Sequence, residues 1–191
     1  DNGGNKYDDM GDMKKIGNNT PRYLFGLDLN ADYKGFDFRA FFQGVMKRDY
    51  WQGSAYFWGA TSLWHSTGFV EHADYFRAEA SNDLPANLNA YYPRPVFDSS
   101  KNRQKQTAYL QSAAYIRLKN VQLGYTLPAN LTHKFYVSKL RVFVSGENLW
   151  TGTSLANMFD PETIGGGDDT DKNGNAYPLS KTISFGISVT L

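Results

Sequence analysis

The sequence predicts an all-β fold of long antiparallel strands, each with one apolar face and one polar face. Three observations support this prediction: apolar and polar residues alternate in five segments, each segment is about ten residues long or longer, and turns or long polar stretches separate them. The alternation is clearest in Lys181–Leu191, which ends the chain. The five predicted strands are 22–34, 36–46, 115–127, 139–150 and 179–191.

The first two predicted strands form a hairpin. Only Lys34 and Gly35 separate them, and a two-residue turn that contains Gly is typical of antiparallel neighbours. Leu24 is the one apolar residue of the first strand that is out of phase. The residues expected on the apolar face of the hairpin are Tyr23, Phe25, Leu27, Leu29, Ala31, Tyr33, Phe36, Phe38, Ala40, Phe42 and Met46.

The third predicted strand, 115–127, contains a change of phase. Ile116 and Leu118 alternate in one phase, whereas the apolar residues from Val121 onward alternate in the other. A β-bulge near Lys119 and Asn120 would bring both halves onto the same face, because a bulge inserts one extra residue into a strand. We therefore expect a bulge at this point.

The last two predicted strands carry the same pattern. In 139–150 the apolar face holds Leu140, Val142, Val144 and Trp150, while Phe143 and Leu149 are apolar residues on the polar face. In the final strand Ile183, Phe185, Ile187, Val189 and Leu191 share one face, and small or polar residues occupy the other.

The length and spacing of the strands favour a membrane-spanning sheet. Strands in globular proteins most often have about five or six residues, whereas a tilted strand needs about 9–11 to cross a bilayer. The connection at 34–35 is short, while the loops 47–114 and 151–176 are long. Short turns on one rim and long extracellular loops on the other are typical of outer-membrane barrels. A soluble sandwich with one buried face remains the alternative.

Composition excludes several classes of protein. The chain has 191 residues, 20 basic and 19 acidic, and a formal net charge of +1, so a basic nucleic-acid interface is not expected. No cysteine is present, which excludes disulfides and thiolate metal sites. Aromatic residues make up 16%, which suits membrane-interface girdles. No apolar run is long enough for a transmembrane helix, and the start of the chain has neither Met nor a signal peptide, as expected for a mature or truncated product.

Several motifs resemble one family. They are "IGNNTPRYLFGLDLNADYKGFDFRAFFQG", "NLNAYYPRP", "YIRLKNVQLGYTLP", "LRVFVSGENLW", "FDPE" and "YPLSKTISFGISVTL". In this order they resemble the C-terminal end of the SusC/RagA family of TonB-dependent outer-membrane transporters. The chain departs from the family in ending on Leu191, where the family commonly has Phe, and in containing no plug domain or TonB box.

The resemblance implies a fold, a location and a set of partners. The five strands would be the last five of a barrel of the 22-stranded type, in the outer membrane of a Gram-negative bacterium. The remainder of the same barrel and its plug would pair with this segment, since five strands cannot close a large barrel. A SusD-like surface lipoprotein would cap the barrel, and the TonB complex would act through the plug. The implied function is import of oligosaccharides or peptides without enzymatic chemistry.

Few residues suggest catalysis or metal binding. His65, His72 and His133 lie far apart in sequence, so no His-based site is indicated, and no cofactor is expected. The stretch 169–174 resembles the start of a calcium loop, with Asp169, Asp171 and Asn173 as the candidate ligands. Ser180 stands where such a loop requires a bidentate Glu, so a solvated acidic turn is the preferred interpretation.

Two groups of residues are candidates for contact with a transported molecule. Aromatic residues in the loop 47–114 could stack on sugar rings or apolar side chains, although packing within the loop is the favoured interpretation; these are Trp51, Trp58, Trp64 and Tyr92. Polar-phase residues of the strands could face an aqueous lumen or form ion pairs along the wall; these are Arg117, Lys119, Arg141 and Glu147.

Two functions of other classes remain open. A soluble carbohydrate-binding β-sandwich would use the same aromatic residues, but it predicts shorter strands and a core that hides every apolar face. A structural or adhesive outer-membrane barrel would have the same wall without TonB dependence or a lipoprotein lid. Strand length disfavours the first, and the family motifs disfavour the second.

Overall fold

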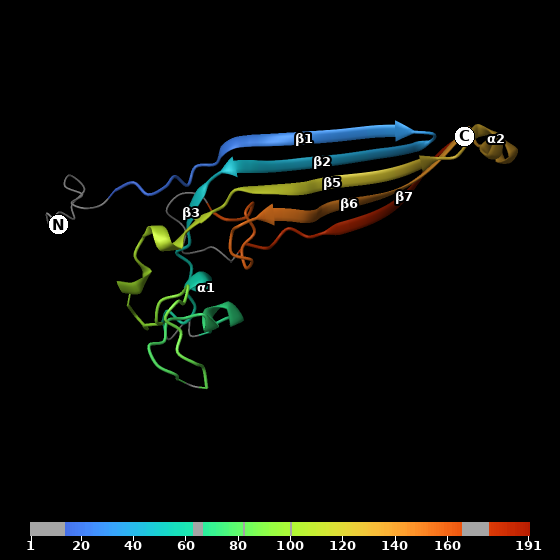
Figure 1. Cartoon of the computed structure of the whole chain (residues 1–191). Coiled ribbons are helices and arrows are strands. Elements are labelled where there is room, and N and C mark those ends of the chain that lie inside the picture. The colour runs from blue at the N-terminus through green and yellow to red at the C-terminus, as the bar shows by residue number, and fades with distance from the viewer. Residues whose placement is uncertain (1–13, 63–66, 82, 100, 166–175) are drawn as a thin grey trace. The chain divides into compact units, whose positions relative to one another are not determined.

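The computed structural model describes residues 14–62, 67–81, 83–99, 101–165 and 176–191. The chain divides into two compact units (Figure 1). The sheet unit comprises Thr20–Arg48, Ser112–Ile164 and Gly174–Leu191, and the loop unit comprises Asp1–Asn19, Asp49–Gln111 and Gly165–Asn173. In the described part of the chain, no helix is long and apolar enough to span a membrane.

The sheet unit is built on five long antiparallel strands. They are β1 (Arg22–Tyr33), β2 (Phe36–Lys47), β5 (Tyr115–Thr126), β6 (Lys139–Thr153) and β7 (Thr182–Thr190). Their order in the sheet is β1-β2-β5-β6-β7, so sequence neighbours lie side by side (Figure 1). The predicted all-β antiparallel class is therefore confirmed.

Two strand boundaries differ from the predicted ones by three residues, and the other strand ends agree to within one residue. β6 continues three residues beyond 150, and β7 begins at Thr182 rather than at 179. The ladder between them ends at the Glu147–Thr182 pair. The next residue of β6, Asn148, has a φ of 52°, which turns the backbone away from the regular pleat and ends the pairing with β7.

The β1–β2 hairpin turns as its sequence requires. Lys34 and Gly35 both have positive φ, 46° and 88°, the combination that a tight two-residue hairpin turn requires. A side chain at Gly35 would also meet the carbonyl oxygen of Thr126, because a Cβ built there lies 2.8 Å from it. Thr126 in turn donates its N–H to the Gly35 carbonyl at 2.7 Å, which fastens the turn to β5.

The expected bulge in the third strand is confirmed. The register shifts between Phe41 and Phe42 on β2, and between Leu118 and Asn120 on β5. Lys119 is the extra residue, so the apolar residues before and after it face the same side. Without this residue the two halves of β5 would present their apolar side chains to opposite faces of the sheet.

The connection between β5 and β6 lies at the same end of the sheet as the β1–β2 hairpin turn (Figure 1). It contains α2 (Ala129–Thr132) and the short 3-10 helix η4 (His133–Phe135). Pro128 precedes α2, and Tyr136 at the end of η4 has a left-handed φ of 59°. The connection is therefore short and locally ordered.

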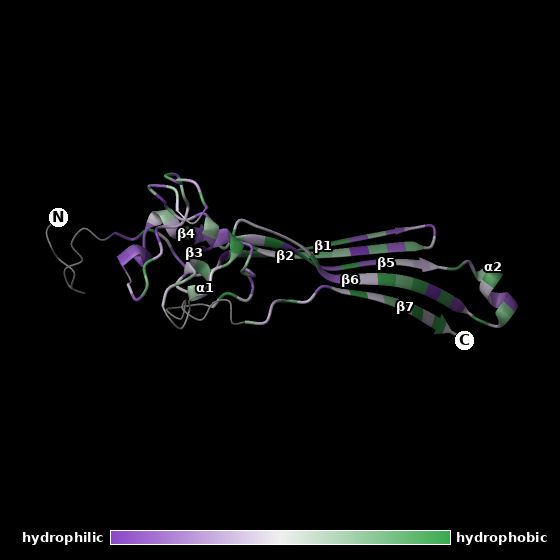
Figure 2. Ribbon diagram, turned by 90° about the horizontal axis from the view of Figure 1, so that it is seen from below, coloured by the Kyte–Doolittle hydropathy of each residue, from purple (hydrophilic) through white to green (hydrophobic). Residues whose placement is uncertain are grey.

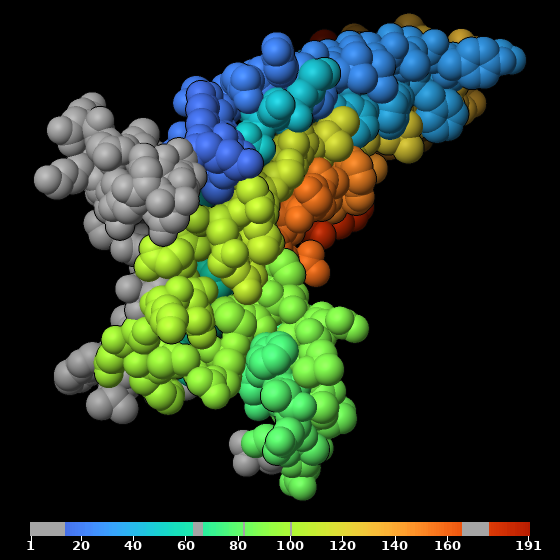
Figure 3. Space-filling view, turned by 60° about the vertical axis from the view of Figure 1, so that its left-hand side comes forward, coloured from blue at the N-terminus to red at the C-terminus, as the bar shows by residue number. Residues whose placement is uncertain are grey.

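The loop unit contains short elements around aromatic side chains. They are β3 (Asp49–Trp51), α1 (Ala55–Trp58), η1 (Val70–Ala73), η2 (Lys101–Arg103), η3 (Thr107–Tyr109) and β4 (Leu110–Ser112), with β3 and β4 forming a two-stranded sheet. Tyr50 and Phe57 are fully buried at its centre. Residues of this unit, in green shades, form a closely packed surface in Figure 3. Most of the predicted loop 47–114 thus belongs to a compact unit, together with residues from other parts of the chain.

Candidate functional sites: a two-faced sheet and a basic groove

One face of the sheet is apolar and exposed. The register of the four strand pairs places alternate residues of every strand on this face. Those of the five strands that are large, apolar and at least 39% exposed include Leu27, Leu29, Tyr33, Phe36, Phe38, Met46, Leu123, Val142, Trp150, Ile183, Phe185, Ile187 and Val189. Figure 2 shows the resulting alternation of hydrophobic and hydrophilic residues along the strands. Soluble proteins rarely expose so large an apolar surface.

Aromatic rings gather where this apolar face meets the hairpin turn. Tyr33 pairs with Phe36 across the hairpin, and Phe36 pairs with Tyr125 on β5. The ring centroids of Phe36 and Tyr125 lie 4.5 Å apart. Tyrosine at the margin of an apolar band is typical of the aromatic girdles of membrane barrels, because its ring is apolar and its hydroxyl is polar.

The opposite face of the sheet carries ion pairs between strands. Arg39 donates to both carboxylate oxygens of Asp28, at 2.6 Å from Nη2 and 3.2 Å from Nε. Arg141 on β6 reaches across β5 to Asp37 on β2 in a bidentate pair, with Nε 2.8 Å from Oδ2. Its Nη2 also donates to Gln122 at 3.2 Å. Arg141, predicted on the polar phase, therefore links three strands.

The densest cluster of charges joins β5 to the segment after β6. Arg117 has a side chain only 3% exposed; its Nη2 lies 2.7 Å from Asp160 Oδ2, and its Nη1 lies 3.3 Å from Glu162 Oε1. Its Nε donates to the hydroxyl of Thr151 at 2.7 Å. Lys119, the bulge residue, donates to Glu162 Oε2 at 3.0 Å. Because the two carboxylates face two cations, this part of the polar face is nearly neutral.

The four predicted lumen-facing residues thus share one face but not one cluster. Arg117 and Lys119 are brought together, Arg141 lies elsewhere on the face, and Glu147 is exposed opposite Asn120 and Thr182. Sequence reasoning missed their acidic partners. The motif "FDPE" contains Asp160 and Glu162, but no local pattern in the sequence pairs them with Arg117.

Glycines explain the aromatic residues on the polar face. The ring of Phe143 covers Gly186 on the adjacent strand, and the Arg141 guanidinium lies 4.8 Å from the Phe143 ring centroid. Phe41 covers Gly26 in the same way, since a Cβ built on Gly26 would lie 3.3 Å from its ring. An aromatic ring over a strand glycine fills the space that a missing side chain leaves, and it stabilises the pairing. The rings of Phe143 and Phe41 therefore pack against the sheet itself.

The aromatic candidates in the loop unit are mostly buried. Trp58 is 8% exposed and donates its indole N–H to the Gln52 carbonyl at 2.7 Å, and Tyr92 is 7% exposed. Phe57 contacts both rings, with centroids 5.0 Å from Trp58 and 5.4 Å from Tyr92. Burial raises the pKa of Tyr92 to about 12. Stacking on a substrate requires an exposed ring, so these positions favour packing.

Other predicted residues lie elsewhere. Trp64 and the calcium candidates Asp169, Asp171 and Asn173 fall outside the described residues. His72 accepts the backbone N–H of Phe69 on Nδ1 at 2.9 Å, and its Nε2 lies 2.9 Å from the Phe57 carbonyl. Both ring nitrogens of this histidine therefore serve the packing of the loop unit.

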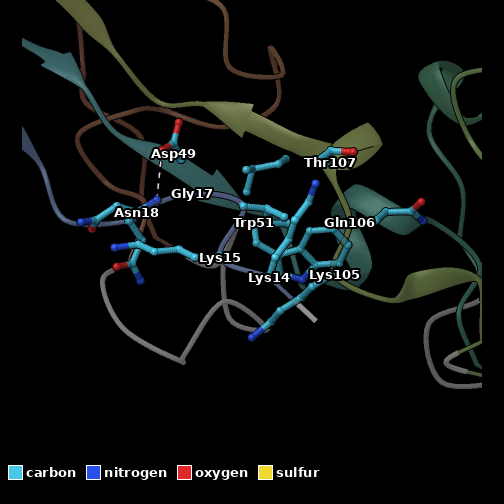
Figure 4. Close-up of a pocket in the computed structure, with 12 residues that line it drawn as sticks. Lys14, Lys15, Gly17, Asn18, Asp49, Trp51, Lys105, Gln106 and Thr107 are labelled. Atoms are coloured by element: carbon cyan, nitrogen blue, oxygen red, sulfur yellow. Dashed lines mark hydrogen bonds between the residues drawn. The ribbon is translucent and has the colours of Figure 1, made fainter. Parts of the chain in front are cut away.

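Trp51 is the predicted aromatic residue that reaches an open site. It is half-buried and lines a groove of about 900 Å³ in the loop unit (Figure 4). The segment 14–19 forms one wall and is tied to β3, because Asn18 donates its N–H to Asp49 Oδ2 at 3.0 Å and accepts from Asp49 N–H at 2.9 Å. A Cβ on Gly17 would lie 2.8 Å from Leu110, so glycine permits this close approach.

Three lysines make the groove basic. Lys14 and Lys15 come from the first wall and Lys105 from the other, and all three are exposed. Asp49 is the one acidic residue of the lining, and its carboxylate already accepts a hydrogen bond. Sequence reasoning missed the lysines, because nothing in a single sequence places Lys14 and Lys105 on the walls of one groove.

Comparisons with known proteins were made for the whole chain. No protein-family model matches it. TonB-dependent receptor P3 of Formosa agariphila is 29% identical over 185 residues, covering 93% of this chain and 17% of that protein. TonB-dependent receptor P26 of the same organism is 28% identical over 209 residues, covering 98% of this chain and 20% of that protein. The chain therefore spans about a fifth of the length of these relatives.

Solved structures show the same fold. A chain of the RagAB peptide importer in the "open-open" state superposes with a TM-score of 0.63 at 25% identity, over 90% of this chain and 17% of that one. The "closed-closed" state gives a TM-score of 0.66 at 24% identity, over 92% of this chain and 18% of that one. The resemblance to the SusC/RagA family of TonB-dependent receptors, predicted from the motifs of this chain, is thereby confirmed in sequence and in fold.

Proposed function

We propose that the chain forms the last five strands of a 22-stranded outer-membrane barrel that imports an oligosaccharide, with a peptide as the second candidate substrate. Its partners would be the remainder of the same barrel, a plug, a SusD-like surface lipoprotein and the TonB complex. The observation that carries the proposal is the sheet with one exposed apolar face and one ion-paired polar face. The names of the relatives support a receptor or importer and not an enzyme.

The dimensions of the apolar face suit a bilayer. On β2 this face runs from Phe36 to Met46, and strands rise about 3.4 Å per residue, so it extends roughly 34 Å along the strand. Barrel strands tilt by about 35–45°, which reduces this length to a height of roughly 25 Å. That height equals the apolar band of an outer-membrane barrel, about 25 Å.

The two outer strands support incorporation into a larger sheet. β1 pairs with β2 and β7 pairs with β6, so in the described sheet each has a second edge with backbone groups available for pairing. Backbone groups in a bilayer must be hydrogen-bonded, and only a closed barrel satisfies every strand edge. The rest of the same barrel is the partner that satisfies both edges at once.

The polar face suits an aqueous lumen. Its ion pairs join different strands of the sheet, β1 to β2 and β2 to β6, and its charges would be costly against lipid. A soluble carbohydrate-binding sandwich fits less well, because its core would have to cover side chains such as Phe185 and Ile187, which are 84% and 70% exposed. A structural or adhesive barrel would have the same wall, and the comparisons favour transport over it.

An uptake experiment with the whole transporter tests the proposal. Cells that carry the transporter would be offered fluorescent oligosaccharides and peptides, with and without TonB and with and without the lipoprotein. The proposal predicts uptake that requires the transporter, TonB and the lipoprotein, with oligosaccharides preferred. Uptake of peptides alone would support an importer, but one whose substrate is a peptide and not an oligosaccharide. Absence of any TonB-dependent uptake would contradict the proposed function.

A further inference from the structure

We propose that the basic groove of the loop unit binds an oligosaccharide that carries carboxylate or sulfate groups. The inference rests on the proposed function and narrows its substrate to an anionic sugar. It is carried by the juxtaposition of Lys14, Lys15 and Lys105 with the Trp51 ring on the walls of one groove (Figure 4).

The groove has the size and construction of a binding site. Its volume of about 900 Å³ lies at the upper end of the usual range for ligand sites, roughly 300–1,000 Å³. Its two walls come from segments far apart in sequence, 14–19 and 105–110, with β3 between them. The paired hydrogen bonds between Asn18 and Asp49 hold the first wall in place.

The charges of the lining favour an anion. Three ammonium groups line the groove, against the one carboxylate of Asp49. Like charges that line one groove repel, and a bound anion relieves this repulsion while it forms charge-assisted hydrogen bonds. The lysines are exposed, so they remain hydrated and available to a ligand that enters from solvent.

The remaining lining favours a sugar over an acidic peptide. Trp51 is half-buried and offers a flat apolar ring, which suits the face of a pyranose. Around it stand Asn19, Gln106 and Thr107, whose amides and hydroxyl can donate to and accept from sugar hydroxyls. An acidic peptide such as polyglutamate would satisfy the lysines, but it lacks the flat ring face that stacks on Trp51.

Binding to the purified whole transporter tests the inference. The probes would be an oligogalacturonate, a neutral maltooligosaccharide of the same length and a polyglutamate peptide, measured by titration calorimetry. The test variant is Lys14→Gln, Lys15→Gln and Lys105→Gln together. The matched control, Lys101→Gln, Lys134→Gln and Lys181→Gln, removes the same charge from exposed lysines outside the groove.

The test variant should weaken oligogalacturonate binding by roughly 3- to 100-fold, the combined effect of three exposed ion pairs, and the control should change it by less than about twofold. Trp51→Ala should also weaken oligogalacturonate binding, and Lys14→Arg, Lys15→Arg and Lys105→Arg together should preserve it. For the unmodified transporter, the affinity should fall as salt is raised, because salt screens exposed charges. This last measurement does not depend on the folding of any variant.

Several results would overturn the inference. One is equal loss of affinity in the test variant and the control, and another is oligogalacturonate binding that salt does not weaken. Preference for polyglutamate with the same lysine dependence would assign the groove to an acidic peptide instead. TonB-dependent uptake of neutral oligosaccharides without oligogalacturonate binding would overturn this inference and leave the proposed importer intact, whereas loss of all uptake would remove both.

Discussion

Arg117 Nη2 lies 2.7 Å from Asp160 Oδ2, and this ion pair joins the middle of the sheet to a segment 43 residues later in the chain. The Arg117 side chain is 3% exposed, and Asp160 and Glu162 are each 16% exposed, so the carboxylates depend on this arginine for compensation. The segment that follows β6 is therefore held on the polar face of β5 by these ion pairs, and it also buries the apolar side chains of Leu155, Phe159 and Ile164.

Loss of this arginine should release the segment that it holds. Arg117→Met leaves two partly buried carboxylates with Lys119 alone, and breaking a buried pair from one side typically costs about 3–5 kcal/mol. Amide hydrogen exchange in 155–164 should become faster in the whole transporter, while exchange in β1 should stay unchanged. Lys119→Met is the control, and its effect should be smaller because Lys119 is 25% exposed and reaches only Glu162. Equal effects of the two substitutions would contradict the assignment of Arg117 as the main anchor.

A charge should be tolerated on one face of β7 and not on the other. Phe185→Lys places an ammonium on the apolar face and should destabilise the barrel by about 2–4 kcal/mol if it meets the middle of a bilayer. Ser184→Lys adds the same charge one residue away on the polar face and should cost far less. Denaturant unfolding of the transporter in lipid vesicles measures both. Similar costs for the two variants would mean that the faces do not differ in their surroundings.

The loop unit should lose stability at alkaline pH through Tyr92. Its pKa is raised above the ordinary value of 10.0 to about 12, because burial disfavours the charged phenolate, and Tyr91, Glu71 and Asp74 add repulsion. The stability that the buried neutral phenol contributes is fully present below pH 10 and is lost as the pH rises through about 12. Tyr92→Phe should remove the latest step from the tyrosinate absorbance titration and reduce the alkaline loss of stability between these values. If Tyr92→Phe instead removed absorbance from the step near the ordinary pKa of 10.0, the phenol would be solvated and the prediction would be wrong.

Gly44 should not accept a side chain. A Cβ at this position would collide with the backbone carbonyl oxygen of Tyr115 and with the Phe25 ring. Overpacking of this kind typically costs about 1–3 kcal/mol, and here a strand backbone would have to move. Gly44→Ala should therefore lower the unfolding midpoint, whereas Gly68→Ala, with its nearest neighbour at 3.8 Å, should be close to neutral. A neutral Gly44→Ala would show that β2 and β5 can separate slightly at no cost.

The sheet could be predicted from sequence because its signal is local. Alternation with a period of two assigns each residue to a face, and the change of phase between Leu118 and Val121 was enough to predict the bulge at Lys119. The pairing of Phe143 with Gly186 was not visible, since it depends on register between two strands. Phe143 therefore looked like an exception to the pattern, although it fills the space above a glycine.

The sites were harder to predict because they are assembled from distant segments. The alternation predicts Arg117 on the polar face of the sheet. Its partners Asp160 and Glu162 lie beyond the end of β6, and no local pattern predicts that this segment folds back onto β5. The groove requires the segment 14–19 to lie beside β3, through a hydrogen bond between Asn18 and Asp49. Single sequences contain no periodic signal for such contacts, so only Trp51 was identified in advance.

The central claim is that the apolar face of the sheet meets lipid and the ion-paired face meets water. Spin labels placed one at a time at residues 183–189 of β7, in the whole transporter in bilayers, measure this directly through their accessibility to oxygen and to a water-soluble nickel chelate. A lipid-facing apolar side should give high oxygen accessibility at Ile183, Phe185 and Ile187 and high chelate accessibility at Ser184 and Ser188, alternating with a period of two. Uniform chelate accessibility, or low accessibility to both reagents at the apolar positions, would contradict it.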